Sequence, residues 1–250
     1  MNDSPQSTSS RGSRILGILA AISALFLVLY AFWFSKADVE LSNTVRILYL
    51  HVPTVIVAYL CLVANLVASV FYLWKRSEFA DQLAAATGEI GMVFLGVTVI
   101  TGMFWGKPTW GTYWSWGDAR LTSTLLLFLL YVGYVVVRNI PAELGQRNVR
   151  SAVVGIVAAL MIYPVRMSTE WFSTLHQGRT VGAPGASKIS GNQEFALYLG
   201  FLTFALFAVW LTMHRFRVGW LADRAAESDL ESAIEARRAE GRAEFGKVNP

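Results

Sequence analysis

Residues 52–74 read VPTVIVAYLCLVANLVASVFYLW, and none of these side chains carries a charge. The hydrocarbon core of a bilayer is about 30 Å thick, which an α-helix crosses in about 20 residues. A run of this length and composition therefore predicts a helix that spans a membrane, with lipid rather than water around it.

Five further apolar blocks of similar length flank this one along the 250-residue chain. They are Ile15–Phe34, Leu83–Phe104, Leu121–Val137, Val149–Val165 and Phe195–Met213. The chain is 54% hydrophobic and 15% charged, which exceeds the apolar content that one soluble core of this size uses. We therefore predict an all-α integral membrane protein with six transmembrane helices. The first block is too long for the apolar part of a secretory signal and lacks a small-residue cleavage site after Phe34, so we expect it to be retained.

The basic residues suggest how the helices are oriented. The N-terminus, the turn at 75–82, the loop at 138–150 and the C-terminal tail share one face, and their arginines and lysines are denser than those of the opposite loops. The positive-inside rule then makes this face cytoplasmic, with both termini inside. We predict three regions, which are a disordered Ser-rich segment 1–13, a six-helix domain 14–217, and a charged, helical cytoplasmic tail 218–250.

A tryptophan-rich loop joins the third and fourth predicted helices on the outer face. Residues 105–120 read WGKPTWGTYWSWGDAR and hold four of the nine tryptophans in the chain. Trp110 and Trp114 stand one helical turn apart, and we expect them to form a flat apolar surface for a planar ligand, with Asp118 one turn further along. The alternative is a surface helix that rests among lipid headgroups.

Two of the three histidines fall on the same outer face. His51 opens the second helix, with Pro53 in its first turn, and His176 follows the fifth helix. A single histidine at a helix end is usually a polar cap, whereas a pair beside an aromatic loop suits the two axial positions of a haem iron. We therefore predict that His51 and His176 ligate haem iron, and that His214, at the cytoplasmic end of the sixth helix, does not.

The haem propionates need cations, for which Arg120 and Arg46 are the best candidates, although arginines at helix starts also face lipid phosphates. The only cysteine, Cys61, lies inside the second helix, and no Cys-x-x-Cys-His site exists, so the haem would be bound without a thioether link. Glu89 is the one acid well inside an apolar block. Contact with another helix, extension of its side chain toward water and a chemical role all remain open.

Three segments carry a resemblance to a known family. They are RILYLHVP from Arg46 to Pro53, WGTYWSWGDARLTS from Trp110 to Ser123, and EWFSTLHQG from Glu170 to Gly178. Together they resemble the CcmC family of cytochrome c maturation proteins, which are haem-handling membrane proteins named for a Trp-Trp-Asp loop. The similarity runs in order from about Arg14 to His214.

The resemblance implies six transmembrane helices in the bacterial inner membrane and haem b bound transiently through His51 and His176. It implies that Trp110, Trp114, Trp116 and Asp118 form a platform, and that a membrane-anchored haem chaperone, CcmE, receives the haem. It also implies that an ABC-type ATPase and its membrane subunits take part. Gly117 departs from the family pattern, because it stands between Trp116 and Asp118; it either rotates Asp118 on a helix or marks a turn.

No hydrolase, nucleotide-binding or nucleic-acid-binding pattern competes with this interpretation, so we expect a haem-delivery subunit rather than an enzyme. Three alternatives remain at this stage. One, an attachment synthase of the same broad superfamily, would be a longer chain with more helices and more histidines. A solute permease would place polar groups near the bilayer midplane, and a b-type cytochrome would hold haem ligands on facing helices within the membrane.

Overall fold

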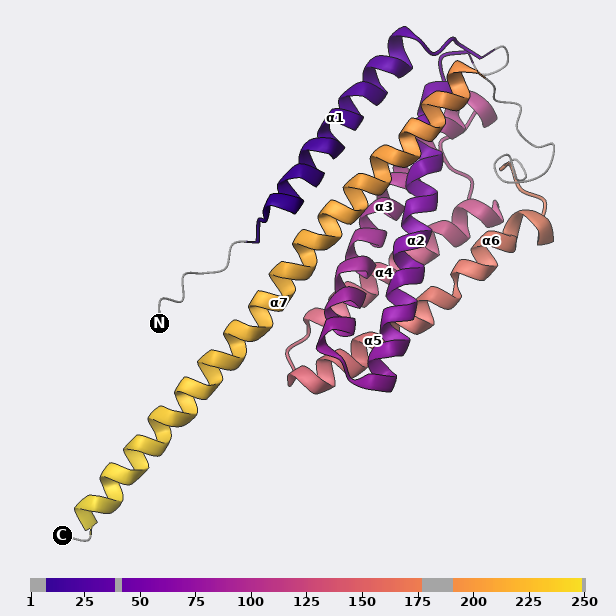
Figure 1. The fold of residues 1–250 in the computed structure, drawn as a ribbon. Coiled ribbons are helices and arrows are strands. Elements are labelled where there is room, and N and C mark those ends of the chain that lie inside the picture. The colour runs from indigo at the N-terminus through magenta and orange to yellow at the C-terminus, as the bar shows by residue number, and fades with distance from the viewer. Residues whose placement is uncertain (1–7, 39–41, 177–190, 249–250) are drawn as a thin grey trace.

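The computed structural model describes residues 8–38, 42–176 and 191–248. Over these described residues the regular structure consists of helices without strands, and one isolated β-bridge joins Asp38 and Ser42. The helices, shown in Figure 1, are α1 (Arg11–Trp33), α2 (Val45–Lys75), α3 (Glu78–Trp110), α4 (Ala119–Asn139), α5 (Leu144–Leu160), α6 (Ile162–Trp171) and α7 (Asn192–Val248).

Six helical segments in the described part of the chain are long and apolar enough to cross a membrane. Five are α1, α2, α3, α4 and the apolar part of α7, and the sixth is α5 together with α6, from Leu144 to Trp171. These two helices are separated at Met161, and Pro164, which has no N–H to donate, follows in the first turn of α6. The predicted all-α fold with six spanning helices is confirmed.

Large apolar side chains cover the outside of the bundle. In α1, for example, Ile15, Ile18, Ile22 and Leu25 are each more than half exposed. A water-soluble protein rarely exposes an apolar surface of this extent, whereas a helix in lipid satisfies all its backbone groups internally and gains from such a surface. The exposed side chains therefore agree with the composition in placing this bundle in a membrane.

The start of α2 differs from the prediction. The helix begins at Val45, so His51 lies in its second turn, and Pro53 lies in its interior rather than in its first turn. Proline cannot donate to the carbonyl four residues earlier, here that of Tyr49. α7 packs closely at this point, because a Cβ added to Gly200 would lie 2.9 Å from Pro53 Cγ and would overlap Tyr49 O.

The tryptophan-rich segment also differs from the prediction. α3 continues through Trp110 and ends at Gly111, whose φ of +78° is a left-handed conformation that favours glycine. Residues 112–118 are not helical, so the expected one-turn spacing of Trp110 and Trp114 on a helix is wrong. Gly117 lies in a turn closed by the Asp118 N–H donating to Ser115 O at 3.2 Å, and Asp118 then caps α4. Of the two predictions for Gly117, a rotation of Asp118 on a helix or a turn, the structure shows the turn.

α7 is the longest element and passes beyond the bundle at the end that also carries the N-terminus of α1 (Figure 1). α1 packs along α7, where Ser23 and Thr203 share a buried hydrogen bond of 2.6 Å. Near its start, α7 is tied by the Asn192 side chain, which donates to Phe34 O. Further along, Asp223 accepts from Arg147 at 2.6 Å, so α7 is fixed at two widely separated points.

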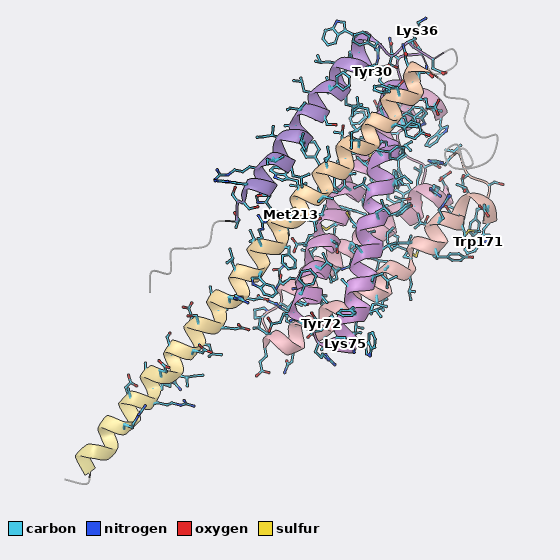
Figure 2. All side chains as sticks on the ribbon, viewed as in Figure 1. Tyr30, Lys36, Tyr72, Lys75, Trp171 and Met213 are labelled. Atoms are coloured by element: carbon cyan, nitrogen blue, oxygen red, sulfur yellow. The ribbon has the colours of Figure 1, made fainter. Side chains whose placement is uncertain are left out.

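Figure 2 separates the two ends of the bundle, with Lys36 at one end and Tyr72 and Lys75 at the other. The first, where α3 ends and α4 begins, is called the loop end here, and the second the tail end. Charged pairs gather toward the tail end. Asp81 accepts both guanidinium contacts of Arg138, at 2.9 and 2.6 Å, and Glu89 is paired in the same two-contact manner with Arg215 of α7. Glu89 therefore makes a contact between helices, which was one of its three predicted roles.

Candidate functional site

A cavity of about 570 Å³, partly open to solvent, lies at the loop end between α2, α3 and α4. Five of the eight residues predicted as site residues line it, from four separate parts of the chain. They are His51, Trp110, Trp114, Arg120 and His176.

The walls of the cavity are mainly apolar and aromatic. Val55 and Tyr59 follow His51 at intervals of four residues, so they continue its face of α2. Leu95 and Val99 contribute from α3, and Leu121 from α4. Tyr59 was not among the predicted residues, although the four-residue spacing from His51 was a signal that could have identified it.

His51 is held against α3 by a hydrogen bond to Thr101 and packs beside a glycine. Its Nδ1 lies 3.0 Å from Thr101 Oγ1. A Cβ added to the next residue, Gly102, would lie 3.1 Å from His51 Cε1, so the missing side chain leaves the room that the imidazole occupies. Neither Thr101 nor Gly102 was predicted, because an ordinary Thr-Gly pair in an apolar span gives no distinctive signal.

His176 reaches the same cavity from the segment that follows α6. Its ring lies 6.0 Å from that of Trp110, centroid to centroid, at an interplanar angle of 55°. The backbone beside it is fixed, because Leu175 N donates to Asp118 Oδ2 at 2.6 Å and Thr174 Oγ1 donates to His176 O at 3.0 Å. Gln177 and Gly178, which complete the third sequence motif, lie outside the described residues.

Asp118 does not line the cavity, and it is only 4% exposed. One carboxylate oxygen caps α4 by accepting from Leu121 N at 2.9 Å, while the other accepts from Leu175 N. The carboxylate thus joins the tryptophan-rich loop, the start of α4 and the segment that carries His176. This positioning contact between two loops was not anticipated from the sequence.

The three predicted loop tryptophans occupy different environments. Trp110 ends α3 and lines the cavity, and Trp114 lines it from the loop. The indole Nε1 of Trp114 is buried and finds no acceptor among the described residues. Trp116 is 73% exposed and packs edge-on against Trp114 at 5.6 Å, so it lies outside the cavity.

The two predicted arginines are also separated. Arg120 lines the cavity, and its Nη1 donates to Val165 O at 3.0 Å. Arg46 instead turns toward α1, where its Nε donates to Ala31 O at 2.8 Å and its guanidinium lies 5.1 Å from the ring of Phe32. The cavity therefore receives one of the two cations and not the other.

The donor set suits haem. Two imidazoles can bind iron, a guanidinium can bind a carboxylate, and aromatic walls can contact the porphyrin plane. The buried Trp114 Nε1–H, without an acceptor of its own, offers a further donor to a bound anionic group. The residues present thus fit an iron porphyrin with two propionates.

Comparison with known proteins gives a consistent result. The family model described as "Heme exporter protein C" (CcmC) matches residues 3–231. The protein of that name from Haemophilus influenzae is 34% identical over 222 residues, covering 85% of this chain and 89% of the relative. Those from Bradyrhizobium diazoefficiens and Rhodobacter capsulatus are 33% and 34% identical, covering 81% and 82% of this chain and 76% and 86% of the relatives. This six-helix chain, with its paired histidines at one cavity, therefore belongs to the CcmC family.

Proposed function

We propose that this protein binds haem b in the loop-end cavity, with His51 and His176 as the two axial ligands of the iron. The observation that carries the proposal is that two of the three histidines in the chain, one from α2 and one from beyond α6, line the same cavity. Both fit the neutral imidazole ligation that haem iron accepts. The role that we propose is haem handling for cytochrome c biogenesis, and the name of the relatives, "Heme exporter protein C", agrees with its haem part.

The other cavity residues divide the remaining tasks. Arg120 pairs with a propionate, because its guanidinium lines the cavity and retains donors beyond the one given to Val165 O. Trp114 offers its free N–H, and Trp110 supplies an aromatic wall beside His176. Arg46 is not assigned to a propionate, because its guanidinium is engaged with α1.

Haem leaves this site intact and is not linked to the protein. The single cysteine, Cys61, is buried in α2 and no thioether pair exists. The chain would contribute positioning rather than acid–base groups, so it acts as a delivery subunit and not as an enzyme.

The exposed rim of the site is where a partner would dock. Trp116 and Tyr113, 73% and 50% exposed, stand on the same loop as Trp114, and exposed aromatic side chains are typical anchors of protein interfaces. The partner we propose is a membrane-anchored, CcmE-like haem chaperone, with an ABC-type ATPase and its membrane subunits in the same assembly. In this arrangement the loop end faces the periplasm and both termini face the cytoplasm of a bacterial cell.

The absorption spectrum of the purified protein tests the ligand assignment. We expect six-coordinate, low-spin haem in the wild type and loss of the low-spin spectrum in His51→Ala and in His176→Ala. His214→Ala is the matched control, because His214 packs on Trp210 at 5.3 Å and does not line the cavity. A low-spin spectrum that survives in both cavity variants would exclude the proposed ligation.

A further inference from the structure

Thr101 makes three close polar contacts through one oxygen atom. Its Oγ1 lies 2.7 Å from Val97 O, 3.1 Å from Thr98 O and 3.0 Å from His51 Nδ1. The first two contacts are the back-bond that a threonine in a helix makes to its preceding turn. The third joins α3 to the histidine of α2.

Counting protons assigns the direction of each contact. A hydroxyl has one hydrogen, and a carbonyl oxygen can only accept. If the Thr101 hydrogen pointed at His51 Nδ1, two oxygens would face each other at 2.7 Å without a hydrogen between them, which is repulsive. The hydroxyl therefore donates to the carbonyls, and His51 donates its Nδ1–H to this turn of α3, where Thr101 Oγ1 lies 3.0 Å away and Thr98 O is a second acceptor.

This assignment decides which nitrogen of His51 can bind a metal. With the proton on Nδ1, the neutral ring has its free lone pair on Nε2. The hydrogen bond also restricts rotation of the ring, and Gly102 leaves the space in which the ring is held.

We propose that Thr101 is a positioning residue for the haem ligand His51, because it fixes the Nδ1–H tautomer and presents Nε2 to the iron. This inference rests on the proposed haem ligation. Thr101 does not itself line the cavity, so its effect on haem acts through His51.

Replacing Thr101 tests the hydrogen bond directly. Thr101→Val removes the acceptor with little change of volume, and we expect haem affinity to fall about tenfold or more, as for other partners of metal-bound histidines. Because the hydrogen bond makes the imidazole more basic and favours ferric iron, we also expect the reduction potential to rise. Thr101→Ser keeps the oxygen and should restore both quantities.

Thr87 provides a matched control on the same helix. Thr87 is also buried, and its hydroxyl makes the same back-bond, to Leu83 O at 2.7 Å and Ala84 O at 3.3 Å. It does not line the cavity. Thr87→Val should therefore leave the haem affinity and the potential at wild-type values. Affinity and potential are measured by haem titration and by redox titration of the full-length protein in detergent.

The outcomes separate this inference from the proposal beneath it. Wild-type values in Thr101→Val, or no recovery in Thr101→Ser, overturn the role of Thr101 while the loss of low-spin haem in His51→Ala still supports ligation. An unchanged low-spin spectrum in His51→Ala overturns the ligation by His51, on which this inference rests.

A second measurement applies if Thr101→Val does not fold. Thr101→Ala removes the same oxygen and is smaller, and it can be combined with His176→Ala, which leaves His51 as the single proposed ligand. Resonance Raman of the ferrous double variant reports the Fe–His stretching frequency, which falls when the Nδ1 hydrogen bond is lost. The same frequency with and without Thr101 would overturn the inference.

Discussion

Asp118 does not line the cavity, but it holds two of the segments that do. Its two carboxylate oxygens accept from Leu121 N and Leu175 N, so one side chain fixes both the start of α4 and the backbone beside His176. Losing a helix cap costs about 1 kcal/mol, and the second hydrogen bond adds to this.

We therefore expect Asp118→Ala to lower the thermal stability by several degrees and to release haem faster, with Asp118→Asn intermediate because one amide oxygen can still accept. Thermal unfolding and the rate of haem transfer to apomyoglobin measure the two effects. Asp229→Asn, on the exposed tail, serves as the control. Release at the wild-type rate from Asp118→Ala would contradict the positioning role.

Trp114 allows the donor and the aromatic ring to be tested separately. Trp114→Phe keeps an aromatic wall but removes the buried N–H, and a hydrogen bond to a charged group contributes about 1.5–3 kcal/mol. We expect haem affinity to fall about tenfold or more, whereas Trp116→Phe, outside the cavity, should bind haem as the wild type does. Equal affinities for Trp114→Phe and the wild type, in the same haem titration, would rule out a donor role.

Rare residue types made part of the site predictable. Histidines and arginines are costly in an apolar chain, so His51, His176 and Arg120 were identified from the sequence. Thr101 and Gly102 could not be, because their importance arises only when α3 packs against α2. Arg46 shows the converse, since sequence alone could not reveal that its guanidinium turns toward Ala31 O.

The sequence was sufficient to predict that six spanning helices exist, but not at which residues each helix begins and ends. The apolar blocks gave all six spans, because the bilayer thickness sets their length. The ends follow local polar contacts that hydropathy does not report: Ser77 caps α3 at one end, and Gly111 terminates it at the other. Because α3 ends at Gly111, the structure places Trp105 and Trp110 in a helix and Trp114 and Trp116 in the following loop.

The contact between α2 and α7 should be sensitive to a single methyl group. A Cβ on Gly200 meets Pro53 and overlaps Tyr49 O, and Tyr49 O is a backbone atom that cannot turn aside as the end of a flexible side chain can. Overpacking of this kind costs about 1–3 kcal/mol. We expect Gly200→Ala to lower the melting temperature in detergent, whereas Gly133→Ala, with nothing within 4 Å, should raise it slightly or leave it unchanged. An unaltered melting temperature for Gly200→Ala would show that the two helices can separate without cost.

For the whole molecule, the testable property is its orientation in the membrane. Cys61 is buried, so single cysteines introduced at exposed positions can be labelled selectively. With a membrane-impermeant maleimide on intact cells, we expect Tyr113→Cys to react and Ser228→Cys to react only after lysis. The reverse pattern would place the loop-end cavity on the cytoplasmic side of the membrane.

α7 runs without a break from Asn192 to Val248, roughly 85 Å at 1.5 Å per residue. Gly200, near its start, rests on Pro53, two residues from His51, while its far half stands clear of the bundle (Figure 1). The Asp223–Arg147 ion pair lies between these two parts of the helix. One continuous helix therefore connects the part of the chain that extends beyond the bundle with the residues packed next to His51, the proposed haem ligand.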